Sequence, residues 1–123
     1  MPRKKKKKLL IVDNDVDLLE TLVDYLKRCN FDVIGSSSSL EALKLLRSNK
    51  FDLVLTDIVM PDISGLGLIS IIKNELGHIP VIAMTGYGEK VEKLTKERKP
   101  DYYLEKPFAM DQLVKVIDHL LSS

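Results

Sequence analysis

Short, continuous runs of apolar residues alternate along this chain with segments of helical periodicity, and this alternation restricts the possible folds most strongly. The clearest runs are residues 9–12, 53–55 and 79–84. Each is bounded by turn residues, which is typical of strands that are buried on both faces of a parallel sheet. Two weaker runs, residues 31–34 and 102–104, predict two further strands.

Apolar residues at helical spacing predict a helix after each strand. The first helix is expected to turn Val16 and Leu19 toward the core, and the second is expected to do the same with Leu40. Asn14 or Asp15 can cap the first helix, and Ser38 or Ser39 can cap the second. The expected helices cover approximately residues 16–26, 39–49, 64–77, 89–98 and 110–121.

The order is therefore strand then helix, repeated five times with short connections. Right-handed crossovers place such helices on both faces of the sheet, so we predict an α/β fold with a doubly wound, five-stranded parallel sheet. The 123 residues allow one domain of this kind. In such folds the functional crevice lies beyond the carboxyl ends of the strands.

The charge of the chain is unevenly distributed. Its net charge of +1 includes Arg3 and the lysines at 4–8, and the other 13 basic residues are outnumbered by 18 acidic ones. We expect residues 1–7 to form a disordered basic leader before a domain at 8–123. An electrostatic contact with nucleic acid or anionic lipid is the competing interpretation. No aromatic residue interleaves the lysines, which argues against a surface for stacking nucleic-acid bases.

The chain carries no sign of secretion. Cys29 is the single cysteine, so no internal disulfide can form. No apolar run is long enough for a signal peptide or a membrane span. We therefore expect a cytoplasmic protein without membrane insertion.

Polar side chains of a particular kind follow the predicted strands. Asp13, Asp57, Thr85 and Lys106 each come at or just after a strand end, so the topology predicts that they converge. Two close carboxylates repel each other unless a cation shares the site, and Mg²⁺ suits carboxylates and water. Lys106 and Thr85 suit the oxygens of a phosphoryl group, and an aspartate can form an aspartyl phosphate.

In these motifs the chain resembles the receiver domain of two-component response regulators, in its stand-alone, chemotaxis-regulator-like single-domain form. The matching segments are residues 10–15, 57–62 with Gly65, 84–88 and 106–108, and the resemblance covers nearly the whole chain. It implies a (βα)5, flavodoxin-like fold with strand order 2-1-3-4-5. It also implies a cis peptide bond between Lys106 and Pro107.

The resemblance implies that Asp57 accepts a phosphoryl group from a sensor histidine kinase in the presence of Mg²⁺. Asp13, Asp57 and the backbone carbonyl of Val59 would then hold the metal ion. Asn14 stands where the family usually has a second acidic residue. Because one formal charge is missing there, we expect weaker binding of Mg²⁺ and tighter binding in the variant Asn14→Asp.

Further roles also follow from the resemblance. Thr85 and Lys106 would bind the phosphoryl group, and Tyr103 would change rotamer on activation. Val59 and Tyr87 would hinder the attacking water and so prolong the lifetime of the aspartyl phosphate.

We therefore predict a phosphorylation-controlled signalling domain that assists only its own phosphorylation and dephosphorylation and is otherwise not an enzyme. Its expected partners are a sensor histidine kinase or phosphotransfer protein and an unidentified downstream protein. A monomer is expected, or a weak homodimer through the fourth helix, fifth strand and fifth helix. One alternative is a phosphorylation-independent interaction module, in which Asn14 has compromised the metal site. Another is a small aspartate-nucleophile phosphatase, which the chain length disfavours.

Overall fold

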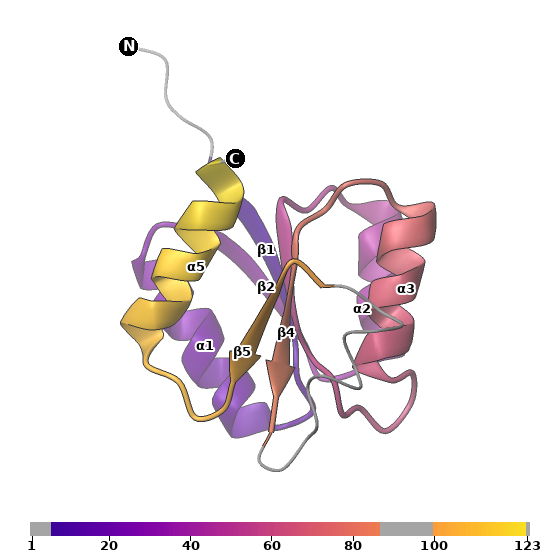
Figure 1. Cartoon of the computed structure of the whole chain (residues 1–123), viewed down its shortest axis with the longest axis horizontal. Helices are drawn as coiled ribbons and strands as arrows, with labels where there is room; N and C mark the ends of the chain where they lie inside the picture. Colours follow the sequence, from indigo (N-terminus) through magenta and orange to yellow (C-terminus); the bar gives the residue numbers. More distant parts are fainter. Residues whose placement is uncertain (1–5, 87–99, 123) are drawn as a thin grey trace.

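The computed structural model describes residues 6–86 and 100–122, and these residues form a parallel sheet covered by helices on both faces (Figure 1). The sheet has five strands in the order β2-β1-β3-β4-β5, and every pair of neighbours is parallel. This confirms the predicted doubly wound, flavodoxin-like topology. The strands are β1 (Lys8–Val12), β2 (Asp32–Ser36), β3 (Leu53–Asp57), β4 (Val81–Thr85) and β5 (Tyr102–Glu105).

Helices α1 (Val16–Arg28) and α5 (Met110–Ser122) cover one face of the sheet. Helices α2 (Ser39–Ser48) and α3 (Gly65–Glu75) cover the other face (Figure 1). The helix expected at residues 89–98 lies outside the described residues. Within 6–86 and 100–122, no helix is both long and apolar enough to cross a membrane.

Short polar side chains cap the first three helices. The Asp15 carboxylate accepts from Leu18 N–H (3.2 Å), the Ser38 hydroxyl from Glu41 N–H (3.2 Å) and the Ser64 hydroxyl from Gly67 N–H (3.1 Å). Each side chain satisfies a backbone donor that has no partner within its own helix. Of the two caps considered for each of the first two helices, the structure uses Asp15 and Ser38.

Two of the expected core positions are wrong. Val16 and Leu40 are 52% and 50% exposed, respectively. Both lie in the first turn of a helix, at positions that the sheet and the neighbouring elements leave exposed. The buried stripe of α1 therefore starts at Leu19, and that of α2 continues through Ala42.

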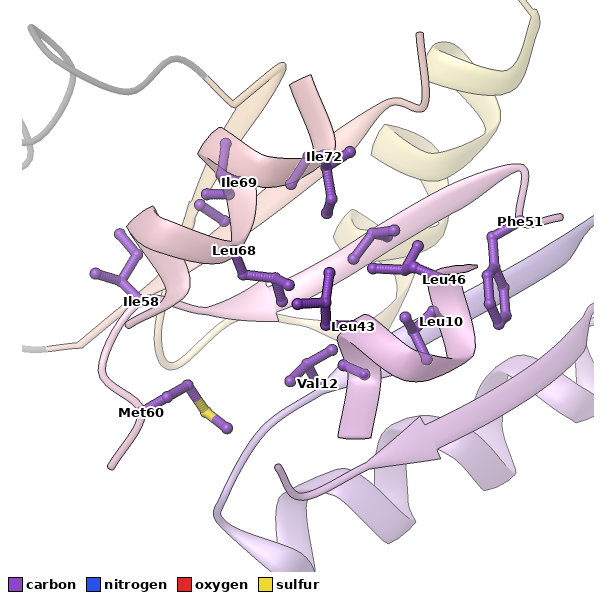
Figure 2. Packing of buried hydrophobic residues seen from close by; sticks show 14 residues of the cluster. Leu10, Val12, Leu43, Leu46, Phe51, Ile58, Met60, Leu68, Ile69 and Ile72 are labelled. Atoms are coloured by element: carbon purple, nitrogen blue, oxygen red, sulfur yellow. The ribbon is translucent and has the colours of Figure 1, made fainter. Parts of the chain in front are cut away.

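The apolar strands divide their side chains between two buried clusters, one on each face of the sheet. In β1, Leu9 and Ile11 face α1 and α5, whereas Leu10 and Val12 face α2 and α3. Figure 2 shows the second cluster, in which Leu10 and Val12 lie among side chains of α2 and α3. Because successive residues point to opposite faces and both faces are covered, the central strands are continuously apolar.

The beginning of the described chain already takes part in the sheet. The Lys7 carbonyl accepts a hydrogen bond from Asp32 N–H (2.9 Å), one step before β1 begins. The Lys8 N–H donates to the carboxylate of Asp52 (2.7 Å), which follows α2. Residues 1–5 of the expected basic leader lie outside the described residues.

Gly65 lets the start of α3 lie directly on the end of β3. Its N–H donates to the Ile58 carbonyl (2.8 Å). A Cβ at this position would overlap the carbonyl oxygen of Asp57 and lie 2.6 Å from the Cα of Ile58. Both obstacles are backbone atoms, so a larger residue can be accommodated only if α3 moves away from Asp57.

We predict that Gly65→Ala lowers the free energy of unfolding by about 1–3 kcal/mol, the usual cost of overpacking. Gly67→Ala is the matched control, because a Cβ there meets Ile63 Cγ2 at 3.2 Å and a side chain can yield. Alanine is also favoured over glycine within a helix by up to about 1 kcal/mol. Urea denaturation of both variants measures the difference, and an equal loss in the two would contradict this account of Gly65.

Candidate functional site

Two acidic side chains meet at the carboxyl edge of the sheet, joined by one lysine. Lys106 Nζ lies 2.9 Å from Asp13 Oδ2 and 2.9 Å from Asp57 Oδ2. Asp13 is completely buried and Asp57 is 8% exposed. The structure therefore brings together the predicted carboxylates and the predicted lysine, which are far apart in the sequence.

Strand order explains this meeting. β1 and β3 are neighbours, so Asp13, just after β1, comes close to Asp57, at the end of β3. Lys106 follows β5, and its N–H donates to the Thr85 carbonyl at the end of β4 (2.8 Å). The Lys106–Pro107 peptide bond is cis, as expected.

Backbone donors orient the other carboxylate oxygens. Asp13 Oδ1 accepts from Asp15 N–H (2.9 Å), and Asp57 Oδ1 accepts from Val59 N–H (3.2 Å). Each carboxylate thus has one oxygen bound to its own loop and the other bound to Lys106. The two Oδ2 atoms are consequently turned toward a shared point.

The protonation of the site depends on burial and on this pairing. Burial raises the pKa of Asp13, and the nearby charge of Asp57 adds to the rise. The Asp15 N–H and Lys106 act in the opposite direction by stabilising the carboxylate. Burial would lower the pKa of Lys106, but its hydrogen bonds and charge interactions with Asp57 and Asp13 raise it overall. The lysine is therefore a fixed positive charge between the two acids.

Thr85 contributes a hydroxyl to the same edge. Its side chain is fully buried, and Oγ1 has no hydrogen-bond partner among the described residues. Buried hydroxyls are usually paired, so an unpaired one calls for an explanation. In register, Asp57 lies beside Met84, the residue before Thr85. The hydroxyl is thus a donor available to a group held near Asp57.

The donor set fits a hard divalent cation. No cluster of three or more histidine, cysteine, aspartate or glutamate side chains occurs in the described part of the chain. Asp13 and Asp57 supply two carboxylates, and Asn14 and the Val59 backbone have neutral oxygens one and two residues further along the chain. Mg²⁺ is commonly bound by one or two carboxylates with several waters, so these residues fit it.

The other predicted residues are placed as follows. Tyr103 is half-buried, packs against the cluster beneath α2 and α3, and has a pKa raised by burial. Val59 is 60% exposed in the loop after Asp57. Asn14 is exposed in the loop after β1. Tyr87 lies outside the described residues.

Asp62, in the loop after β3, has contacts that no sequence pattern indicates. Its carboxylate accepts from Leu40 N–H (3.0 Å), Ser38 Oγ–H (2.9 Å) and Ser39 N–H (3.3 Å) at the start of α2. These hydrogen bonds, with the Leu40 N–H contributing most, lower the pKa of Asp62 to about 2. No local pattern indicates a contact across 22 to 24 residues of sequence.

Comparison with known proteins gives a consistent result. A family model described as the response regulator receiver domain matches residues 9–118. The chain is 36% identical over 123 residues to the probable transcriptional regulator ycf29 of Pyropia yezoensis, covering 94% of this chain and 53% of that protein. It is 37% identical over 118 residues to the two-component response regulator ORR24 of Oryza sativa subsp. indica, covering 93% of this chain and 18% of that protein.

The chain thus spans about half the length of the first of these relatives and less than a fifth of the second. Among solved structures, a putative response regulator from Chloroflexus aurantiacus superposes with a TM-score of 0.88 at 30% identity. That alignment covers 97% of this chain and all of the other.

Proposed function

Because the chain belongs to the family of response regulator receiver domains, we propose that Asp57 accepts a phosphoryl group from a sensor histidine kinase or a phosphotransfer protein. Receiver domains are signalling domains rather than classical enzymes, and they interact with such partners. The observation that carries the proposal is the Lys106 ammonium, which lies 2.9 Å from Asp57 and 2.9 Å from Asp13. It places positive charge where a phosphoryl group on Asp57 needs it.

In the proposed reaction an oxygen of Asp57 attacks the phosphorus of a phosphohistidine. The new O–P bond forms as the P–N bond breaks, and the imidazole leaves with the electron pair and then takes a proton. Lys106 and the Thr85 hydroxyl hold oxygens of the transferred group. Mg²⁺, held by Asp13, Asp57 and the Val59 carbonyl, would neutralise charge on that group. We propose that phosphorylation of this chain depends on Mg²⁺, as it does in the family.

Signalling then depends on a change at the site. A phosphoryl group gives Lys106 and Thr85 a new acceptor, and Tyr103 changes rotamer as Thr85 moves. Val59 and Tyr87 limit access of water to the aspartyl phosphate. A nearly complete switch needs about 5.5 kcal/mol of differential stabilisation, so we expect an intermediate population of the active state without phosphate.

The proposed readout is binding to an unidentified downstream protein. We place this action in the cytoplasm, with the chain acting as a monomer or as a weak dimer through β5, α5 and the segment before them.

Asn14 favours one alternative, a domain that binds a partner without phosphorylation. It supplies a neutral amide where the family usually has an acid, so one charge is missing from the proposed metal site. The two functions differ in whether Asp57 takes up a phosphoryl group at all.

We predict that incubation with acetyl phosphate and Mg²⁺ adds one phosphoryl group to the protein, as measured by intact mass. The Asp57 carboxylate displaces acetate, so Asp57→Ala should show no uptake. Asp17→Ala is the matched control, because Asp17 is an exposed acid in the first turn of α1 and should leave uptake unchanged. Chelation of the metal should abolish uptake in every protein.

Uptake that persists in Asp57→Ala would show that another group reacts and would overturn the assignment. No uptake by the wild-type protein, with the donor active on another receiver domain, would favour the phosphorylation-independent alternative.

We also predict that Asn14→Asp tightens Mg²⁺ binding by about tenfold, the effect of about 1.4 kcal/mol. The added carboxylate increases the negative charge beside Asp13 and Asp57. Isothermal titration with Mg²⁺ measures the change, and Asp32→Asn, at the opposite edge of the sheet, serves as the control. Equal affinities in Asn14→Asp and the wild-type protein would refute a metal site at this position.

A further inference from the structure

We propose that Asp62 is a positioning residue for phosphoryl transfer, because its carboxylate braces the loop after Asp57 against the N-terminus of α2. This inference rests on the proposed function for its chemistry. We use "brace" for the hydrogen bonds that the side chains of Asp62, Ser36 and Ser38 make in the structure.

The contact between the loop and α2 is made by one carboxylate with three donors. Asp62 Oδ2 accepts from Ser38 Oγ–H (2.9 Å) and Leu40 N–H (3.0 Å), and Oδ1 accepts from Ser39 N–H (3.3 Å). Two of these donors are backbone groups in the first turn of α2, which carry partial positive charge. The Ser38 hydroxyl also caps α2 by accepting from Glu41 N–H (3.2 Å).

The loop between β3 and α3 is held at its other points by different means. Its start is fixed where Val59 N–H donates to Asp57 Oδ1 (3.2 Å), and its end is fixed where Gly65 N–H donates to the Ile58 carbonyl (2.8 Å). Met60 is buried in the core (8% exposed), whereas Val59 is 60% exposed. Asp62 lies in the exposed part between Met60 and Gly65 and ties that part to α2. Loss of Asp62 should therefore free residues 61–64 first, and we expect that freedom to reach the earlier part of the loop, which carries the Val59 carbonyl.

On the other side, the brace reaches Asp13. Ser38 N–H donates to Ser36 Oγ (3.2 Å), and Ser36 Oγ–H donates to the Ser38 carbonyl (2.8 Å). The Ser36 carbonyl in turn accepts from Asp13 N–H (3.1 Å). Hydrogen bonds thus run from the backbone of Asp13, through Ser36 and Ser38, to Asp62.

The brace therefore links the backbone of Asp13 to the loop that follows Asp57. β1 and β3 fix the starting points of these loops, but not the course of the chain beyond the strands. Asp13, Asp57 and the Val59 carbonyl would have to keep fixed separations to hold a metal ion together. Loosening the brace should therefore weaken metal binding first. The reactivity of Asp57 at saturating Mg²⁺ should change little.

The first test needs neither metal nor phosphate. Amide hydrogen exchange of the metal-free protein should show faster exchange at Leu40 and Ser39 in Asp62→Ala, because their acceptor is gone. It should also show faster exchange at Val59. The substitution leaves the acceptor of the Val59 N–H in place, so faster exchange there would report greater freedom of the loop. An unchanged rate at Val59 would overturn the brace.

The second test measures the initial rate of phosphoryl uptake from acetyl phosphate against Mg²⁺ concentration. We expect Asp62→Ala to raise the half-saturating Mg²⁺ concentration about fivefold, with the rate at saturation within twofold of wild type. Asp62→Asn keeps an acceptor oxygen, so its half-saturating Mg²⁺ concentration should lie between those of wild type and Asp62→Ala. Asp17→Ala removes an exposed acid in the first turn of α1 and should match wild type.

Loss of stability alone could also slow uptake, so a second control is needed. Lys73→Met breaks the ion pair with Asp101 (2.6 Å) at the far end of α3, away from the site. It should lower the thermal midpoint without changing the Mg²⁺ dependence. If Lys73→Met raises the half-saturating concentration as much as Asp62→Ala does, the positioning role is refuted.

The two proposals fail differently. If the wild-type protein takes up no phosphoryl group, the proposed function fails. Direct titration of the same variants with Mg²⁺ then tests whether Asp62→Ala binds the metal more weakly, as the brace predicts. If wild type and Asp62→Ala take up the group with the same Mg²⁺ dependence, the proposed function stands and the brace is refuted.

Discussion

The ammonium of Lys106, shared by Asp13 and Asp57, is the interaction on which the arrangement of the site depends. Asp13 is completely buried, and Asp57 is nearly so. Two carboxylates in such surroundings repel each other and lose hydration, so each gains from a cation within hydrogen-bond distance. The lysine can reach both because β1, β3 and β5 end at the same edge of the sheet.

Near the shared lysine, the site has features that do not stabilise the folded protein. The buried Thr85 hydroxyl lacks a partner in the described residues, and burial raises the pKa of Asp13. The rest of the molecule is regular, with apolar strands, capped helices and two continuous cores. Departures of this kind, concentrated at one edge of an otherwise consistent structure, are typical of a functional site.

Much of this was predictable from the sequence because its strongest signals are local. Continuous apolar runs marked the strands, and the polar residues after them marked the edge where Asp13, Asp57 and Lys106 meet. The predictions for Val16 and Leu40 were wrong because helical spacing identifies an apolar face but not which of its residues the rest of the fold covers. The contacts of Asp62 with Ser38 and of Asp13 with Ser36 were not predictable, because they depend on the course of loops distant in sequence.

The most direct test of the shared lysine is the pH titration of the Asp13 carboxyl carbon by NMR in the metal-free protein. The account predicts a pKa above the usual 3.8 in the wild-type protein. It predicts a still higher value in Lys106→Met, because the variant removes the hydrogen bond and the positive charge that stabilise the carboxylate. An Asp13 pKa near 3.8 in both proteins would contradict the account.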